Sequence, residues 1–269
     1  MSSRQHGRGR HERGGRRRYE AQALLQESRR LLESSNGTLD VLRESDISGI
    51  EVVPAGSNYT FLAVMVPRDG APFLGIYKPR RGENPLWDYP DGTLYRREHA
   101  SYVMSELLGW PNIPPTVIRD GPHGAGMAQL FVPQVEGDFF SFKKTHAEEM
   151  MKITLFDLLV NNGDRKAGHC LLGVDGRIWA IDHGLTFNPL TRVRTVLWDY
   201  CEEPIPEPLL AQLTELLGDP ARRNLLCERL QRDLEEADVE ALFRRVEGLV
   251  RTGRFPNPDS ERSIPWPPF

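Results

Sequence analysis

Strand-like segments fill the first half of this chain and helix-like segments fill most of the second half, with the change near Gln134. Short apolar runs between turn residues have the strand pattern over 49–66, 72–78, 116–118 and 127–132. Apolar residues at helical spacing mark 93–108, 147–159, 207–217, 221–235 and 238–253. Strands followed by helices are typical of α+β proteins, so the sequence predicts a sheet-rich N-lobe and a helical C-lobe.

The chain divides into four expected parts. Residues 1–18 contain seven arginines against one glutamate and no apolar periodicity, so we expect a disordered basic tail. Residues 19–134 should form the N-lobe, which begins with an amphipathic lead-in helix, and residues 135–253 should form the C-lobe. Residues 254–269 contain five prolines and no period, which predicts an extended tail, packed on the surface or loose.

The composition limits the class of protein and its partners. Hydrophobic residues at 39% and charged residues at 27% fit a globular chain and exclude collagen, coiled-coil and wholly disordered classes. No apolar run approaches the ~20 residues that cross a bilayer, and the N-terminus lacks a secretion signal, so a cytoplasmic location is expected. Three scattered cysteines predict neither a disulfide framework nor a zinc site.

The charge is distributed unevenly. The net charge is −4, and since the arginine-rich tail carries +6, the rest of the chain carries about −10. An acidic body argues against dedicated nucleic-acid binding. The tail by itself leaves open a weak contact with an anionic surface.

Candidate catalytic groups concentrate between Asn161 and Phe187. Asp164, Arg165, Lys166 and His169 share one polar turn, two short apolar strands around Asp175-Gly176 follow, and then comes Asp182-His183-Gly184. A hairpin brings its outer ends together, so His169 and Asp182 are expected to lie close to each other. Asp164 and Arg165 could also form a purely structural ion pair.

A second group of residues could bind phosphate. Lys78 ends an apolar strand, and Glu98 lies early in the 93–108 helix, for which Thr93 is the expected N-cap and Gly109 the expected stop. A lysine that faces phosphates needs an anionic partner, and Glu98 is compatible with that role. The turn Gly56-Ser57-Asn58 can offer backbone N–H groups to phosphate oxygens. Each feature taken alone is ordinary: an edge lysine, a surface glutamate, a turn.

The order of these features resembles that in the phosphatidylinositol 3- and 4-kinases and the HipA-type serine kinases. DRKAGH, the hairpin and IDHG are similar to the catalytic loop and the metal-binding triplet of those families. TLYRREHASYVMSELLGWPNIPPTV resembles the glutamate-bearing helix and following strand of type II phosphatidylinositol 4-kinases, and GMAQLFV resembles their hinge strand. The resemblance covers roughly Gly49 to Trp198.

The resemblance implies a bilobal protein-kinase-like fold that uses ATP and Mg²⁺. It places Asp164 at the catalytic aspartate position and Asp182 at the metal-binding position. Lys166, on the same turn as Asp164, could contact the γ-phosphate or simply face solvent. His169 stands where the family usually carries an asparagine, which implies weaker Mg²⁺ binding, tolerance of Mn²⁺, or a single-metal site. The backbone of the hinge would bind adenine through Leu130, Phe131 and Val132.

The expected activity is therefore transfer of the ATP γ-phosphate to a hydroxyl group of a lipid, a protein or a metabolite. Two alternatives stay open. One is a nucleotide-binding module, or pseudokinase, which the unusual His169 would favour. The other is a metal-dependent phosphoesterase built on Asp164, His169, Asp182 and His183, in which Lys78 and Glu98 would have no role.

Overall fold

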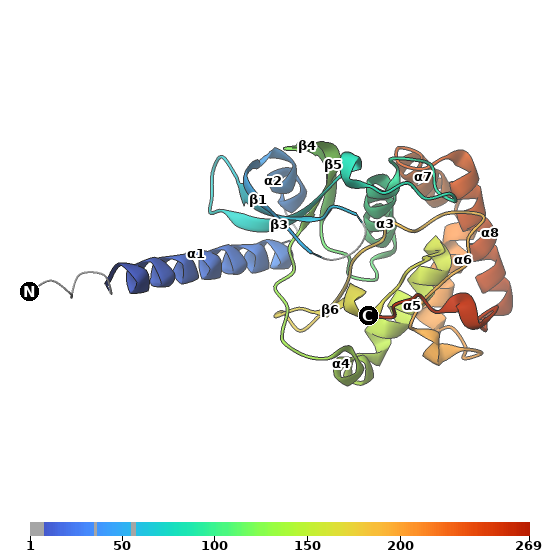
Figure 1. Ribbon diagram of the computed structural model, residues 1–269. Helices are drawn as coiled ribbons and strands as arrows, with labels where there is room; N and C mark the ends of the chain where they lie inside the picture. The colour runs from blue at the N-terminus through green and yellow to red at the C-terminus, as the bar shows by residue number, and fades with distance from the viewer. Residues whose placement is uncertain (1–7, 35–36, 55–57) are drawn as a thin grey trace, which may run out of the picture.

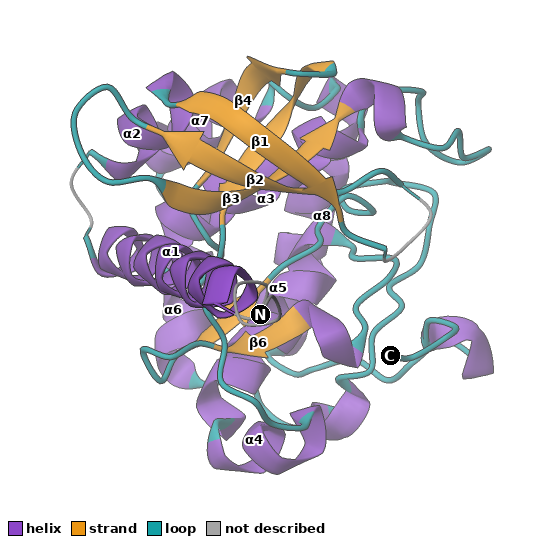
Figure 2. Ribbon diagram, turned by 60° about the vertical axis from the view of Figure 1, so that its left-hand side comes forward, coloured by secondary structure: helices purple, strands orange, loops and turns teal. Residues whose placement is uncertain are grey.

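A computed structural model describes residues 8–34, 37–54 and 58–269 of the chain. An antiparallel sheet with its flanking helices forms one lobe, and a group of helices with a small hairpin forms the other (Figures 1 and 2). The sheet is built from the N-terminal half of the chain and the helical lobe from the C-terminal half. The predicted α+β class, with its sheet-rich and helical regions, is confirmed.

Lys78 lies near the end of the central strand of the sheet. The strands of the sheet are β1 Asp46–Val52, β2 Phe61–Val66, β3 Phe73–Pro79, β4 Thr116–Gly121 and β5 Gly124–Leu130. They pair antiparallel in the order β1-β2-β3-β5-β4, so β3 has a neighbour on each side, and Lys78 lies opposite Met127 of β5. A Cβ at Gly126 would overlap the carbonyl oxygen of Lys78, so glycine allows β5 to approach β3 at this point.

Helices α1 Arg8–Glu33 and α2 Thr38–Glu44 belong to the sheet lobe. Ser28 fixes α1 beside β3, because its hydroxyl accepts a hydrogen bond of 2.9 Å from the Leu74 N–H. The lead-in helix is present, but α1 starts at Arg8, inside the expected disordered tail. Arginine is a good helix former, and extending a formed helix is easier than starting one. Residues 1–7 lie outside the described residues.

Helix α3, Leu94–Leu108, carries Glu98. Thr93 is the N-cap residue of α3, as predicted, but its side chain makes no capping hydrogen bond, because the Thr93 hydroxyl donates to the Pro90 carbonyl instead. The carboxylate of Glu83 takes over this role and accepts the N–H groups of Leu94 at 3.0 Å and Tyr95 at 2.8 Å. The cap therefore comes from an upstream loop, which local sequence rules do not detect. Gly109 ends the helix at φ 77°, as predicted.

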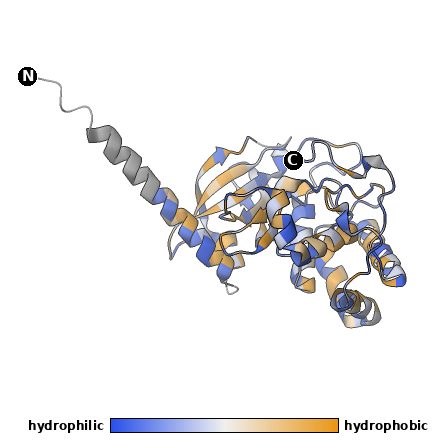
Figure 3. Ribbon diagram, turned by 90° about the horizontal axis from the view of Figure 1, so that it is seen from below, coloured by the Kyte–Doolittle hydropathy of each residue, from blue (hydrophilic) through white to orange (hydrophobic). Residues whose placement is uncertain are grey.

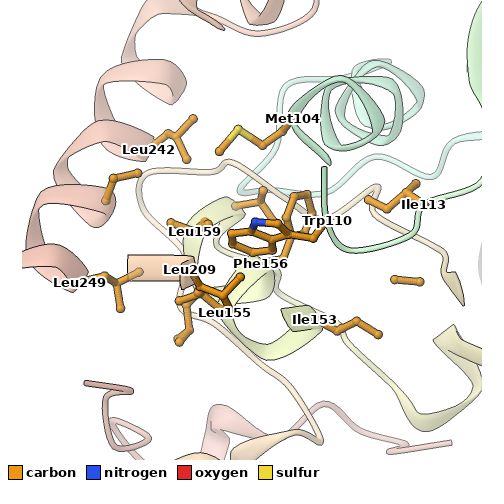
Figure 4. Close-up of a cluster of buried hydrophobic side chains, with 14 of the residues drawn as sticks. Met104, Trp110, Ile113, Ile153, Leu155, Phe156, Leu159, Leu209, Leu242 and Leu249 are labelled. Atoms are coloured by element: carbon orange, nitrogen blue, oxygen red, sulfur yellow. The ribbon is translucent and has the colours of Figure 1, made fainter. Parts of the chain in front are cut away.

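The helical lobe surrounds one central helix. Its members are α4 Phe139–Thr145, α5 Ala147–Val160, α6 Glu207–Gly218, α7 Pro220–Leu230 and α8 Glu236–Thr252. Helix α5 is buried along most of its length, and Leu155, Phe156 and Leu159 pack against side chains from α3, α6 and α8 (Figure 4). Hydrophobic residues concentrate in the strands and helices of the two lobes (Figure 3). Among the described helices, none has both the length and the apolar character that crossing a membrane requires.

The predicted hairpin is present as β6 Cys170–Leu172 and β7 Ile178–Ala180. The carboxylate of Asp175 closes its turn by accepting the Arg177 N–H at 3.1 Å and the Trp179 indole N–H at 3.2 Å. The hairpin is joined to the connection between the lobes, since the Val174 N–H donates to the Pro133 carbonyl at 2.9 Å. These bonds hold the turn of the hairpin, and His169 and Asp182 stand beyond its opposite, open end.

The C-terminal tail packs on the surface of the helical lobe, one of the two predicted outcomes. The carbonyl of Ser263 accepts hydrogen bonds from the Thr195 N–H and the Trp198 indole N–H, both at 2.9 Å. The carbonyl of Pro268 accepts the Ala167 N–H at 2.9 Å. These bonds attach the tail to two loops that flank Asp164.

Candidate active site between the two lobes

A cavity of about 760 Å³ opens between the sheet and the helical lobe. The described residues to which the expected kinase site gives a role line it: Asn58, Lys78, Glu98, Leu130, Phe131, Val132, Asp164, Lys166, His169 and Asp182. Its apolar walls include Val53, Leu62, Ile76, Val132 and Leu171. The cavity therefore joins an apolar part that suits a planar base to a polar part that suits phosphates.

Lys78 is the centre of the polar part. Its ammonium group forms an ion pair with Glu98 of α3 and donates a 2.8 Å hydrogen bond to Oδ1 of Asp182. Glu98 is buried, whereas 46% of the Asp182 side chain is exposed toward the cavity. The sequence leaves open whether Lys78 and Glu98 form an ion pair, and the structure contains that pair. Asp182, from the other lobe, contacts the same ammonium group.

The three charges depend on one another. Burial opposes the charged form of Lys78, but Asp182 and Glu98 outweigh this effect and hold the lysine pKa above its ordinary value. Desolvation also opposes ionisation of Asp182, yet the Lys78 ammonium keeps the aspartate pKa below its usual range. For Glu98, burial dominates over Lys78 and raises the pKa. Lys78 and Asp182 are therefore charged at neutral pH.

The hairpin brings His169 and Asp182 together, as its geometry predicts. Nε2 of His169 lies 3.3 Å from Oδ2 of Asp182, and the Ile181 N–H donates to the His169 carbonyl at 3.0 Å. Burial lowers the pKa of His169 to about 4, so its imidazole is neutral and can act as a ligand. Asp182 has φ 60°, a left-handed conformation that is uncommon outside glycine and tends to occur at functional sites.

Asp164 and Lys166 stand on the loop after α5. The Asp164 N–H donates to Oδ1 of Asn162 at 3.0 Å, and the ammonium of Lys166 lies 3.2 Å from the Asp164 carboxylate. Burial raises the pKa of Asp164, and Lys166 opposes this only in part. The side chain of Asp164 keeps 31% of its surface exposed, so an incoming group can reach it from the cavity.

Arg165 is a residue whose role sequence reasoning missed. It pairs with Asp157 of α5 at 3.0 Å, with both side chains fully buried, and not with Asp164. It also donates to the carbonyl of Ile181 at 2.7 Å and lies 2.6 Å from Nε2 of His183. Burial and the Arg165 charge lower the pKa of His183, so the imidazole accepts this hydrogen bond in neutral form. The only signal in the sequence is a single aspartate inside the apolar run ITLFDLLV.

The connection between the lobes offers fewer backbone donors than predicted. The Leu130 N–H already donates to the Pro115 carbonyl at 2.9 Å, and the Phe131 N–H donates to Leu74 at 3.1 Å. Proline follows at position 133 and has no N–H. Of the three expected hinge residues, Val132 is therefore the one whose amide can still serve a ligand.

The expected phosphate turn is only partly described. Gly56 and Ser57 lie outside the described residues. Asn58 lines the cavity, and its side-chain oxygen accepts the Asn84 N–H at 2.8 Å. Asn58 therefore joins the turn to the loop after β3. Phe269, at the other end of the chain, also lines the cavity, and no feature of the sequence placed it there.

The donor set fits a divalent cation that is bound together with phosphate. Asp182 supplies carboxylate oxygens and His169 a neutral imidazole, a pair that suits Mn²⁺ better than Mg²⁺. Over the ranges 8–34, 37–54 and 58–269, no three His, Cys, Asp or Glu side chains gather closely enough to hold a metal by themselves. A cation here would thus need further ligands such as phosphate oxygens and water.

Sequence comparison finds two informative relatives, although no family model matches the chain. Protein Rv2133c of Mycobacterium tuberculosis is 36% identical over 274 residues, which cover 85% of this chain and 94% of that protein. Phosphatidylinositol 4-kinase gamma 4 of Oryza sativa subsp. japonica is 25% identical over 212 residues, which cover 68% of this chain and 38% of the rice protein. The rice kinase is a distant relative that matches over a minority of its length.

Solved structures share the fold at low sequence identity. The Golgi casein kinase with Mn/ADP bound has a TM-score of 0.53 at 15% identity, with 84% of this chain and 81% of that chain covered. The hydra Fam20 structure with sugar has a TM-score of 0.54 at 16% identity, with 80% and 86% covered. These likenesses show a fold of the atypical-kinase type. The finer assignment to phosphatidylinositol 3-/4-kinases or HipA-type kinases stays an expectation.

The similarity to the mycobacterial protein is higher in sequence identity and extends over most of both chains. On that identity, the chain belongs to the same family as Protein Rv2133c of Mycobacterium tuberculosis.

Proposed function

We propose that this protein is an ATP-dependent phosphotransferase that moves the γ-phosphoryl group to a hydroxyl acceptor. The observation that carries the proposal is the Lys78–Asp182 contact, which joins the two lobes inside a cavity that Asp164 also lines. A structure of the same fold is described with Mn/ADP bound, and a distant relative is named a phosphatidylinositol 4-kinase. The first supports nucleotide and divalent-metal use, the second supports kinase activity, and neither identifies the acceptor.

The sheet lobe would bind the nucleotide. Adenine would lie against the apolar walls and accept a hydrogen bond from the Val132 N–H. The ammonium of Lys78 would contact the phosphates, while Glu98 holds that ammonium in place from α3. The amides of Gly56 and Ser57, with Asn58, are proposed to contact the terminal phosphates.

Asp182 and His169 would hold the divalent cation. When bound, the cation supplies charge neutralisation for the phosphates during transfer. Asp182 is ionised, Lys78 holds one of its carboxylate oxygens, and the residue before it is held to the hairpin by the bond from the Ile181 N–H to the His169 carbonyl. His169 is neutral because of its burial, so it keeps a lone pair for the metal or for a hydrogen bond.

Asp164 would act on the acceptor. The acceptor oxygen attacks the γ-phosphorus, the bond from that phosphorus to the β–γ bridging oxygen breaks, and Asp164 orients the hydroxyl and accepts its proton. The raised pKa of Asp164 makes it a better proton acceptor than an exposed aspartate. Lys166 would stabilise negative charge on the phosphoryl group as it moves.

One alternative has a specific observation in its favour. Imidazole at position 169 differs from the amide of the families that the sequence resembles, which favours a module that binds nucleotide without transferring phosphate. The phosphoesterase alternative is less well supported, because it assigns no role to the Lys78–Glu98 pair that contacts Asp182.

The test is incubation with γ-labelled ATP and either Mn²⁺ or Mg²⁺, with the label followed into protein, lipid and soluble fractions. Asp182→Ala should lower metal-dependent turnover by a factor that corresponds to about 2–3 kcal/mol of transition-state stabilisation. Asp69→Asn, an exposed aspartate in the β2–β3 loop, is the matched control and should keep full turnover. Unchanged turnover in Asp182→Ala would contradict the proposal, and nucleotide binding without any turnover would favour the pseudokinase.

A further inference from the structure

The last ten residues of the chain, Ser260–Phe269, form a segment that we call the C-terminal strap. It follows helix α8 and runs to the chain end marked C in Figure 1, and its last residue, Phe269, lines the active-site cavity. Ser263 is buried within it, and the Ser260 hydroxyl accepts the Arg262 N–H at 3.3 Å. The strap is therefore an ordered part of the surface.

Backbone hydrogen bonds attach the strap to both loops beside Asp164. The Ser263 carbonyl accepts the Thr195 N–H, and the Pro268 carbonyl accepts the Ala167 N–H. Thr195 is itself paired in parallel with Arg165, the residue that follows Asp164. An extended polypeptide that presents a hydroxyl to Asp164 would dock through free backbone groups of such loops. In this structure the strap already uses two of them.

Phe269 brings the strap into the cavity itself. Its ring lines the cavity together with Lys166 and Gly168, and it lies edge-on to Phe140 of α4 with ring centroids 5.8 Å apart. The strap thus spans from the loop after Asp182, across the loop of Asp164, to α4. Phe269 keeps 68% of its surface exposed, so it narrows the entrance without filling the cavity.

We propose that the strap is the acceptor-side wall of the cleft and that Phe269 is a specificity-determining residue. With the C-terminal strap in this position, the cleft admits a small soluble hydroxyl compound and excludes a polypeptide segment. This inference rests on the proposed function and names the class of its acceptor. It follows from the position of the strap, which covers the track that an extended chain would need and leaves Asp164 open from the cavity.

Point variants of the full chain open the strap without touching the catalytic groups. Trp198→Phe removes the indole donor to Ser263 and keeps an aromatic ring, and Phe269→Ala removes the ring in the cavity. Trp266→Ala is the matched control, because this strap aromatic is 89% exposed and does not line the cavity.

Three probes separate the acceptor classes in the labelled-ATP assay. They are the dialysable small-molecule filtrate of a bacterial lysate, a random peptide library containing Ser, Thr and Tyr, and vesicles of phosphatidylcholine with phosphatidylinositol. The native chain should label a compound in the filtrate and leave peptides and vesicles at background. The Trp198→Phe/Phe269→Ala variant should raise peptide labelling by about tenfold, a usual scale for one specificity contact.

Each outcome decides the inference. Labelling of peptides or vesicles by the native chain overturns it, and so does equal peptide labelling by the native chain and the opened variant. Trp266→Ala should behave as the native chain, and an increase there equal to that of the opened variant would also overturn it. Failure of the proposed function is a separate result, since it would remove label that depends on Asp182 from every fraction.

Discussion

Lys78 donates a 2.8 Å hydrogen bond to Asp182, a residue 104 positions away in the chain and in the opposite lobe. The same ammonium group pairs with Glu98, so a single cation holds together the central strand, helix α3 and the end of the hairpin. Each carboxylate lies next to the ammonium group, and the lysine has two carboxylates beside it. This arrangement underlies the proposed reaction and the first prediction.

Lys78→Met should abolish most of the activity. We expect turnover to fall by about 10²- to 10³-fold, the scale for loss of one preorganised electrostatic contact. The affinity for nucleotide, measured by calorimetry with ADP and Mn²⁺, should fall as well. Lys144→Met, on an exposed residue of α4, is the control and should change neither quantity. Full turnover in Lys78→Met would remove Lys78 from the mechanism.

His169→Asn should change the metal preference. The substitution replaces an imidazole 3.3 Å from Asp182 with an amide oxygen, a ligand that Mg²⁺ prefers. We therefore expect the ratio of Mg²⁺-dependent to Mn²⁺-dependent turnover to rise above that of the native chain. His146→Asn, on a histidine between α4 and α5, should leave the ratio unchanged. An unchanged ratio in His169→Asn would indicate that position 169 does not contact the metal.

Arg165→Met should destabilise the whole chain. It leaves the carboxylate of Asp157 buried without its partner, which costs about 3–5 kcal/mol in comparable cases. Urea unfolding at neutral pH measures the free energy of unfolding of each variant. The comparison is Arg244→Met, whose partner Glu240 is exposed at 3.5 Å, and that variant should lie within about 0.5 kcal/mol of the native chain. Equal losses of stability in the two variants would show that the buried pair contributes no more to stability than the exposed pair.

Glu83→Ala should weaken helix α3 from outside the helix. Its carboxylate accepts two N–H groups at the helix start, and losing such a cap costs about 0.5–2 kcal/mol. Thr93→Ala removes a hydroxyl that donates to the Pro90 carbonyl and should cost less. Urea unfolding of the two variants ranks them. A larger loss in Thr93→Ala would restore Thr93 as the cap.

Local sequence patterns predicted most of the elements but not all of their ends. The strands around residues 49–78 and the helices at 147–159 and 207–217 appear close to the expected positions, because their apolar spacing reflects the face that they bury. Helices α2 and α4 were not predicted, since each has seven residues and offers too few apolar repeats to recognise. Helix α7 ends at Leu230, inside the predicted range 221–235.

The active site likewise contains contacts that the sequence could predict and contacts that it could not. The meeting of His169 with Asp182 could be predicted because a hairpin fixes the separation of its own ends. By contrast, the choice of Asp157 as the partner of Arg165, and of Glu83 as the cap of α3, depends on segments that are distant or irregular in sequence. Residue type narrows the possible partners, but only packing selects one of them.

By itself, the sequence determined the α+β class, the order of the elements, and which charged residues stand at the ends of strands and helices, because these properties depend on neighbours within a few positions. The tertiary structure alone decided that Lys78, Glu98, Asp182 and Asp164 line one cavity and that Phe269 reaches its rim. Such contacts form between segments whose separation along the chain says nothing about their distance in space. They are fixed only when the two lobes bury their apolar faces together.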